Sequence, residues 1–256
     1  MTRWIAGLDG CRGGWAAVLL DLDGGGGHRS LSVASVADLV DSGEAPVMIG
    51  IDIPIGLPDR VNGGGRTADR AARAYLGKGR SSVFPVPPRS AVYAADYETA
   101  KALCRAHSDP PFAPSIQCWN ITGAIREVDG LLRARPELAS RLREVHPEVA
   151  FRRLNRDMPL VAGKKGPERA AGLAERRRLL VAAGLPSALV HSNPPRGVGA
   201  DDHLDAMAAL VVARDIVEGG AVPMPDPSET DGHGLPIVIW MPASPGRMAG
   251  GGGIPC

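Results

Sequence analysis

Aromatic side chains are scarce in this sequence of 256 residues, which contains three Phe, three Tyr and four Trp. Proteins that bind single-stranded nucleic acid by stacking bases depend on such rings, so that mode of binding has little support. Long apolar runs are also lacking. A membrane-spanning helix needs roughly 20 consecutive apolar residues, and runs such as Ala206–Ala213 are far shorter. We therefore expect a soluble protein with no membrane partner.

Cysteine motifs and a secretory leader are missing as well. The four cysteines are scattered, and no two have the C-x-x-C spacing of a zinc or redox site. No basic segment followed by an apolar stretch comes after Met1, so we expect a cytoplasmic protein with free thiols. The oligomeric state stays open at this level.

Glycine and proline, with 33 and 23 residues, are concentrated in a few segments rather than spread evenly. The longest such segment is the C-terminal one, from about residue 221 onward. We expect a globular domain over residues 1–222 and a Pro/Gly-rich C-terminal extension over residues 223–256, in which Ile237–Trp240 adds one strand.

The net charge of +1 conceals segments of opposite sign. Residues 1–59 hold three basic and eight acidic side chains, and residues 200–231 hold one and eight. Between them, residues 60–105 hold nine basic and three acidic side chains, and residues 126–181 hold fourteen and eight. This division fits a carboxylate-lined cation site beside a surface that attracts phosphate. Solvated helix faces are the simpler interpretation.

Hydrophobic patterns predict an α/β fold with a mixed sheet. Short apolar runs separated by Gly-rich turns predict strands, namely Trp4–Leu8, Trp15–Leu22, Ser30–Val33 and the wholly buried Val47–Ile53. Periodic segments predict helices, namely Val36–Val40, Thr67–Leu76, Asp96–His107, Ser115–Ala134, Pro136–Arg143, Pro147–Leu154, Pro167–Ala183 and Asp201–Gly219.

Two carboxylates lie at the ends of predicted strands. Asp9 follows the first strand and precedes glycines, which suits either a ligand-binding residue or an ordinary Asp-Gly turn. Asp52 lies within an almost wholly apolar strand. A lone buried carboxylate costs several kcal/mol unless it is paired, so Asp52 needs either a cation or an arginine from the basic middle of the chain.

A second pair of carboxylates lies at the start of the last predicted helix. Asp202 and Asp205 are three residues apart and therefore share a helix face. The helix dipole accounts for Asp202 near the N-terminus, but Asp205 on the second turn gains much less from it. A divalent cation bound between them would account for both residues.

Together these residues predict a metal site. Carboxylate oxygens are hard ligands that favour Mg²⁺ or Mn²⁺ over zinc. Two such ions about 4 Å apart can activate a water and stabilise the leaving oxygen in phosphodiester hydrolysis. We predict that the metal ligands, which are also catalytic residues, are Asp9, Asp52, Asp202 and Asp205.

Five segments also occur in a recognisable order. They are GLDGCRGGW at Gly7–Trp15, IDIPIGLP at Ile51–Pro58, RTADRAARAYLGKGRSSVFPVPPR at Arg66–Arg89, EVHPEVAF at Glu144–Phe151 and DDHLDAMAAL at Asp201–Leu210. Together they resemble the DUF429 family of predicted ribonuclease H-like nucleases. Within that superfamily, DHLDA at Asp202–Ala206 is similar to the D-x-x-D-A of Holliday-junction resolvases, whose first-strand and central-strand acids match Asp9 and Asp52.

The resemblance implies a ribonuclease H-like fold over residues 1–222. Its five-stranded mixed sheet would have three antiparallel strands first and helices on its faces, with a helical insertion at about residues 60–195. The implied activity is a metal-dependent nuclease, and the implied partner is structured DNA or RNA.

The expected insertion supplies the other candidate residues. Glu144, His146 and Glu148 are candidate catalytic groups, acting as a further ligand or in proton transfer, although His-Pro-Glu is also an ordinary helix start. The spacing of Arg66, Arg70 and Arg73 suits either shared phosphate contacts or a salt-bridged surface. The predicted substrate-binding residues are Arg12, Arg66, Arg70, Arg73, Arg80, Lys164 and Lys165, of which the two lysines otherwise belong to a plain loop.

Two other functions compete with a nuclease. Actin-like relatives of this fold bind ATP and transfer phosphate through a similar Asp-Gly turn, but they normally duplicate the fold, and no internal repeat is visible here. A non-catalytic binding module is the other alternative. It leaves four mutually repelling carboxylates unexplained, because without a cation they only cost stability.

Overall fold

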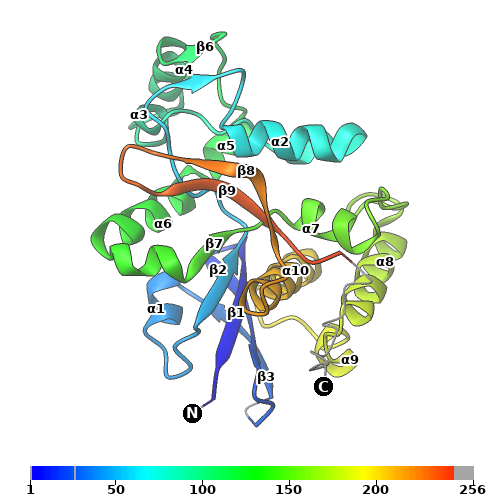
Figure 1. Cartoon of the computed structure of the whole chain (residues 1–256). Coiled ribbons are helices and arrows are strands. Elements are labelled where there is room, and N and C mark those ends of the chain that lie inside the picture. Colours follow the sequence, from blue (N-terminus) through cyan, green and yellow to red (C-terminus); the bar gives the residue numbers. More distant parts are fainter. Residues whose placement is uncertain (1, 26, 245–256) are drawn as a thin grey trace, which may run out of the picture.

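The structure is a computed structural model that describes residues 2–25 and 27–244 (Figure 1). Its centre is a five-stranded mixed sheet with strand order β3-β2-β1-β4-β7. The strands are β1 (Trp4–Cys11), β2 (Gly14–Asp21), β3 (His28–Val33), β4 (Met48–Ile51) and β7 (Leu142–Glu144). The first three form an antiparallel meander, whereas β4 and β7 run parallel to β1. The expected five-stranded mixed sheet is therefore confirmed.

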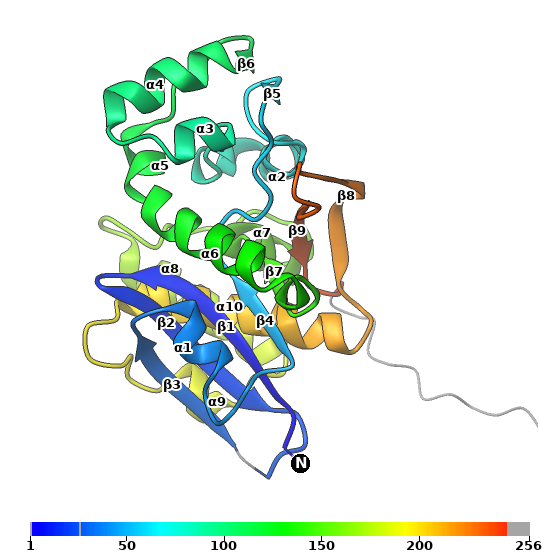
Figure 2. The same ribbon diagram turned by 90° about the vertical axis from the view of Figure 1, so that its left-hand side faces the viewer.

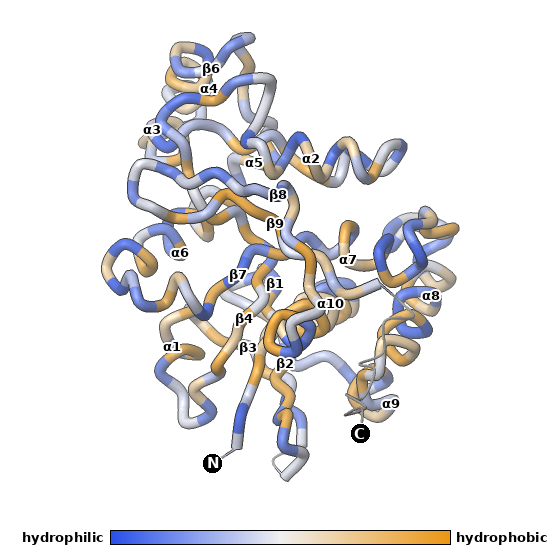
Figure 3. Tube along the Cα trace, in the orientation of Figure 1, coloured by the Kyte–Doolittle hydropathy of each residue, from blue (hydrophilic) through white to orange (hydrophobic). Residues whose placement is uncertain are grey.

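Helices cover both faces of this sheet (Figures 1 and 2). One face packs on α10 (Ala200–Val217), behind which lie α7 (Pro147–Leu154), α8 (Arg169–Ala182) and α9 (Ser187–Val190). The opposite face packs on α1 (Val36–Val40) and α6 (Thr122–Ala134). The sheet and other helices enclose α10, and its residues are accordingly hydrophobic along most of its length (Figure 3).

Two glycines allow α10 to lie directly on the sheet. Gly7 and Gly50 face each other across β1 and β4. A methyl group on Gly7 would lie 2.0 Å from the carbonyl oxygen of Ala206, and one on Gly50 would lie 2.4 Å from that of Ala209. No larger residue fits at either position without moving the helix. This contact brings the first turns of α10 to the carboxyl ends of β1 and β4.

A group of short elements extends beyond that edge of the sheet (Figure 2). It contains α2 (Thr67–Leu76), the 3₁₀ helix η1 (Gly77–Ser82), α3 (Arg89–Val92), α4 (Tyr97–Ala106), α5 (Ile116–Asn120) and the two-residue strands β5 (Val61–Asn62) and β6 (Ser108–Asp109). The predicted bounds of Thr67–Leu76 are those of α2. Much of the expected helical insertion lies here, but α7, α8 and β7 from the same sequence range belong to the body around the sheet.

The C-terminal part of the described chain forms a separate hairpin. The strands β8 (Val222–Thr230) and β9 (Pro236–Met241) pair with each other, and their apolar residues pack on α2. The predicted strand at Ile237–Trp240 is confirmed as part of β9. This hairpin is packed on the body, whereas residues 245–256 of the expected extension lie outside the described residues.

Two helix predictions are wrong in detail. Residues 136–143 form the 3₁₀ helix η2 (Pro136–Ser140) followed by strand β7, because backbone pairing with β4 overrides local helix propensity. The predicted helix Ser115–Ala134 is divided at Ile121 into α5 and α6. Among the described residues, no helix is both long and apolar enough to cross a membrane.

Candidate functional site

Asp9 and Asp52 lie together at the edge of the sheet. Leu8 and Ile51 are paired residues of the parallel strands β1 and β4, so the next residue of each strand reaches the same level. The Asp52 backbone N–H donates to the carbonyl oxygen of Leu8 at 2.9 Å, which extends the pairing by one residue. The carboxyl groups of Asp9 and Asp52 are within hydrogen-bonding reach of each other, a contact in which one of the two must hold a proton. Parallel pairing therefore creates this close carboxyl pair.

Asp205 completes the group from α10. Its side chain is 2% exposed, and its Oδ2 accepts a hydrogen bond from Lys164 Nζ. Its Oδ1 is buried and has no hydrogen-bond partner within the described part of the chain. We call Asp9, Asp52, Asp205 and Lys164 the aspartate cluster. Asp9 is buried like Asp205, whereas Asp52 is half-buried.

The pKa values of these carboxyl groups are raised. Burial is the main cause for Asp9, whose pKa lies well above its usual range, and the charges of Asp52 and Asp205 add to it. Burial also raises the pKa of Asp52, against the opposing charges of His146 and Lys164. For Asp205, burial outweighs the nearby Lys164 and raises the pKa to about 6. The cluster therefore lacks positive charge.

Asp202 lies one turn before Asp205, at the rim of the cluster. It is half-buried in the first turn of α10, and burial together with Asp201 raises its pKa. The position suits the helix dipole as well as a ligand. The negative charge of Asp202 still acts on the cluster, because it contributes to the raised pKa values of Asp9 and Cys11.

The donor chemistry of the cluster suits Mg²⁺ or Mn²⁺, although no preformed cage is present. All the carboxylates supply hard oxygen donors, and the unpartnered Asp205 Oδ1 is a buried acceptor of the kind a cation satisfies. Within residues 2–25 and 27–244, no group of three or more His, Cys, Asp or Glu is arranged to hold an ion. The cation that contacts Asp205 here is the ammonium group of Lys164.

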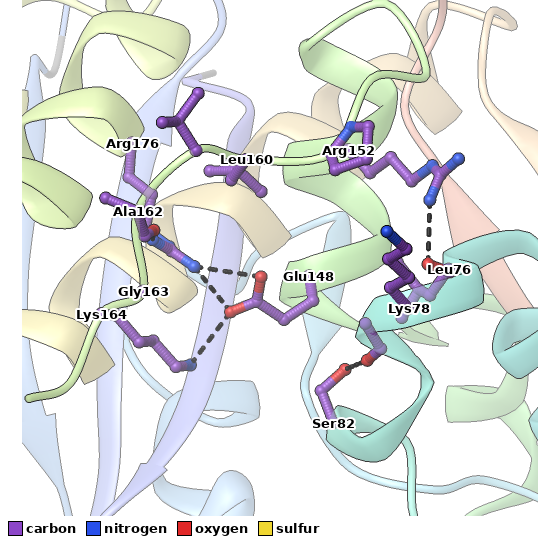
Figure 4. Close-up of a pocket in the computed structure, with 13 residues that line it drawn as sticks. Leu76, Lys78, Ser82, Glu148, Arg152, Leu160, Ala162, Gly163, Lys164 and Arg176 are labelled. Carbon is purple, nitrogen blue, oxygen red and sulfur yellow. Dashed lines mark hydrogen bonds and ion pairs between the residues drawn. The ribbon is translucent and has the colours of Figure 1, made fainter. Parts of the chain in front are cut away.

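Lys164 joins the aspartate cluster to a neighbouring cavity of about 430 Å³ (Figure 4). Glu148, in the first turn of α7, lies in the centre of this view between loop 159–164 and η1. It accepts two hydrogen bonds from Arg176 of α8, at 2.7 and 3.0 Å, and its Oε1 lies 3.9 Å from Lys164 Nζ. Glu148 is therefore paired mainly with Arg176.

His146 lies at a second cavity, of about 210 Å³, which Asp9 and Asp52 also line. Its Nε2 lies 3.2 Å from the carbonyl oxygen of Ser82. Since a carbonyl only accepts, Nε2 carries the hydrogen, and in the neutral form of the ring Nδ1 then holds the lone pair. That Nδ1 is buried and unpartnered among the described atoms. His146 also precedes α7, as an ordinary helix start would require.

A second charged group lines the same cavity, and we call it the arginine cluster: Arg66, Asp69 and Glu144. Arg66 Nη2 lies 2.7 Å from Asp69 Oδ1 and 2.6 Å from Glu144 Oε1. The backbone N–H groups of Ile55 and Val86 donate to Glu144 Oε2 and Asp69 Oδ2 at 2.7 and 2.8 Å. Every carboxylate oxygen of this cluster is thus hydrogen-bonded.

The remaining predicted contacts do not form one basic face. Arg70 donates to the carbonyl oxygens of Asn62 and Gly65, and Arg73 to those of Arg80 and Val83. Those guanidinium groups support the chain around α2. By contrast, the side chains that are exposed are Arg12, Arg80 and Lys165.

Residues 7–230 match the family described as protein of unknown function, DUF429. The chain belongs to the DUF429 family. Comparison with curated proteins and with solved structures gives no match. The match covers Asp9, Asp52, Asp205, Lys164 and the whole arginine cluster, so both charged groups lie within the DUF429 part of the chain.

Sequence reasoning missed two residues of this DUF429 site. The sequence assigns Asp69 no role, because it resembles any acidic residue in a first helical turn, yet it is 1% exposed and pairs with Arg66. Arg176 lies in an arginine-rich helix, and no local pattern distinguishes it from its exposed neighbours. A buried arginine beside an acid is evident only in three dimensions.

Proposed function

We propose that this DUF429 protein is a divalent-metal-dependent phosphodiester hydrolase that acts on structured DNA or RNA. The observation that carries the proposal is the convergence of Asp9, Asp52 and Asp205 from β1, β4 and α10. Buried carboxylates with too few donors are costly unless a cation compensates them. A site that binds a metal ion would explain why these carboxylates lie together at the edge of the sheet.

The strand order supports assigning the fold to the ribonuclease H-like group as part of this proposal. An antiparallel meander is followed by parallel strands, and the acids lie where the pairing between β1 and β4 ends. The helix that carries Asp202 and Asp205 packs on those two strands. This is the arrangement that the resemblance to ribonuclease H-like nucleases implies.

The chain's own residues then have distinct tasks. A bound Mg²⁺ or Mn²⁺ would supply positive charge that activates a water and stabilises the phosphoryl oxygens. Asp9, Asp52 and Asp205 would hold it, with Asp202 at the rim. His146 is the best-placed proton acceptor, because its side chain lines the cavity with Asp9 and Asp52 and its Nδ1, unpartnered among the described atoms, holds a lone pair when the ring is neutral. The exposed Arg12, Arg80 and Lys165 would contact the backbone of a nucleic acid.

The proposal is tested by replacing Asp9. Asp9→Asn removes one ligand charge, and we expect at least a 100-fold loss of cleavage of branched DNA or structured RNA in Mg²⁺ or Mn²⁺. The rise in melting temperature on adding Mn²⁺ should also disappear. Asp59→Asn is the matched control, because Asp59 is exposed and lies outside both charged clusters. It should keep both properties.

Two results would contradict the proposal. Full cleavage by Asp9→Asn would remove the aspartate cluster from the reaction. A wild-type protein that neither cleaves these substrates nor gains stability from Mn²⁺ would instead favour a non-catalytic binding module on the same scaffold.

A further inference from the structure

The ammonium group of Lys164 lies where a metal ion could bind to the carboxylates of the aspartate cluster. We propose that this ammonium group permanently takes the part of one of two metal ions, so that the site binds a single divalent ion beside it. This inference rests on the proposed function and concerns how many ions perform it. The sequence pattern suits a two-ion hydrolase and leaves the number of ions open.

The first support is the position of the ammonium group. Lys164 Nζ donates to Asp205 Oδ2, and the Lys164 side chain is 26% exposed. The next residue of the same loop, Lys165, is exposed and lies outside the cluster. The charge of Lys164 lowers the pKa values of Asp9, Asp52 and Asp205 alike. One ammonium group therefore acts on all three acids.

The second support is the way the loop is held. The carboxylate of Glu175 on α8 accepts hydrogen bonds from the backbone N–H groups of Val161 and Ala162, at 3.1 to 3.3 Å. The carbonyl oxygen of Gly163 packs against Gly172, where a methyl group would lie only 2.1 Å away. These contacts fix the backbone immediately before Lys164. The contacts of this loop with α8 thus position Lys164 beside Asp205.

The third support is the balance of formal charge. Asp9, Asp52 and Asp205 carry three negative charges when ionised, whereas Asp202 lies at the half-exposed rim and Glu148 is paired mainly with Arg176. One divalent ion and one ammonium group supply three positive charges. Two divalent ions beside Lys164 would supply five. A single ion therefore neutralises the buried carboxylates, and the unpartnered Asp205 Oδ1 is an oxygen still available to it.

In the reaction, Lys164 acts by charge alone. Hydrolysis forms a bond between a water oxygen and phosphorus and breaks one phosphorus–oxygen ester bond. The water gives up its proton to a base, for which His146 is placed, and the leaving oxygen takes a proton from solvent. The ammonium group keeps its own protons and stabilises negative charge beside Asp205.

Counting bound Mn²⁺ tests the inference without any measurement of activity. Free Mn²⁺ is followed by electron paramagnetic resonance while the metal-free protein is titrated at pH 8. We expect one tightly bound ion per chain in the wild type and two in Lys164→Met. Lys164→Arg, which keeps the charge, should bind one. Lys78→Met is the control, because it removes an exposed lysine charge outside the cluster, and it should also bind one.

Cleavage gives a second readout. Lys164→Met should lose about 100-fold in rate at low Mn²⁺, the size of effect seen when one charge-stabilising donor is removed. It should recover part of that loss at high Mn²⁺, with a steeper dependence on the ion, because a second ion then replaces the ammonium group.

The outcomes separate the two proposals. A wild type that binds two ions and cleaves nucleic acid overturns this inference and leaves the proposed function standing, whether or not Lys164→Met folds. A variant that folds and still binds one ion also overturns it. A wild type that binds no ion and does not cleave overturns both.

Discussion

The aspartate cluster and the arginine cluster differ in how their charges are satisfied, although they share one sheet edge and Asp9 and Asp52 line the same cavity as the arginine cluster. The parallel strands β1, β4 and β7 each lead to an acid there: Asp9, Asp52 and Glu144. Glu144 receives both ends of a guanidinium fork and a backbone N–H. Asp9 and Asp52 lie beside each other, and the opposing charges that act on them are those of His146, on Asp52, and of Lys164, on both.

This difference separates a stabilising group from a binding group. A buried ion pair whose hydrogen bonds are all made holds its elements together, and the arginine cluster joins α2 to β7. Buried carboxylates without enough donors destabilise the metal-free fold and gain their partner when a ligand binds. The two clusters should therefore respond in opposite ways to the loss of a charge.

The largest effect is expected from Arg66→Met. It leaves Asp69 and Glu144 buried without a cation, which typically costs about 3–5 kcal/mol. Urea unfolding followed by circular dichroism measures this loss. Arg12→Met, at an exposed arginine, should change the free energy of unfolding by less than about 0.5 kcal/mol. A loss below 1 kcal/mol in Arg66→Met would mean that the arginine cluster does not stabilise the fold.

A somewhat smaller effect is expected from pH. The pKa of Asp205 is about 6 in the folded protein and near 3.8 when unfolded. Because the folded value is raised, its contribution is fully present below about pH 4 and is lost as pH rises through 6. The shift corresponds to about 3 kcal/mol. The free energy of unfolding in EDTA, relative to Asp205→Asn, should therefore fall across this range. A constant difference would contradict it.

The smallest effect distinguishes two acids on adjacent strands. Glu144→Gln weakens charge-assisted hydrogen bonds and should cost about 1–3 kcal/mol in EDTA. Asp52→Asn removes repulsion from Asp9 and should cost nothing or add up to about 1 kcal/mol. Thermal unfolding of both variants in parallel provides the measurement. Equal losses would show that the two clusters are not energetically different.

Much of the sheet and the approach of its acids could be predicted from local patterns. β1 and β4 show apolar runs of the right length, and parallel pairing necessarily brings Asp9 to Asp52. The bounds of α1, α2 and α7 follow from helix-start residues and hydrophobic spacing. The catalytic roles of these residues stay predictions, because no comparison bears on them.

The remaining features depend on contacts between distant segments. β7 has three residues, too few for a period, and it exists because β4 supplies its partner. Arg66 has an i+3 acid in its own helix, but Glu144 lies 78 residues away. Lys164 belongs to a loop without periodicity, and Glu175 and Gly172 of α8 determine its position. No local pattern contains that information.

The paired glycines Gly7 and Gly50 determine the distance between α10 and the sheet, and so the size of the site as well as its position. Because backbone meets backbone there, the separation between Asp205 and the strand-end acids is set by main-chain atoms, which adjust far less than side chains do. Mg²⁺ and Ca²⁺ differ by about 0.3–0.5 Å in their distance to oxygen. Preference for the smaller ion would then be a property of helix-to-sheet spacing, and a methyl group on Gly7 would alter it before any ligand is changed.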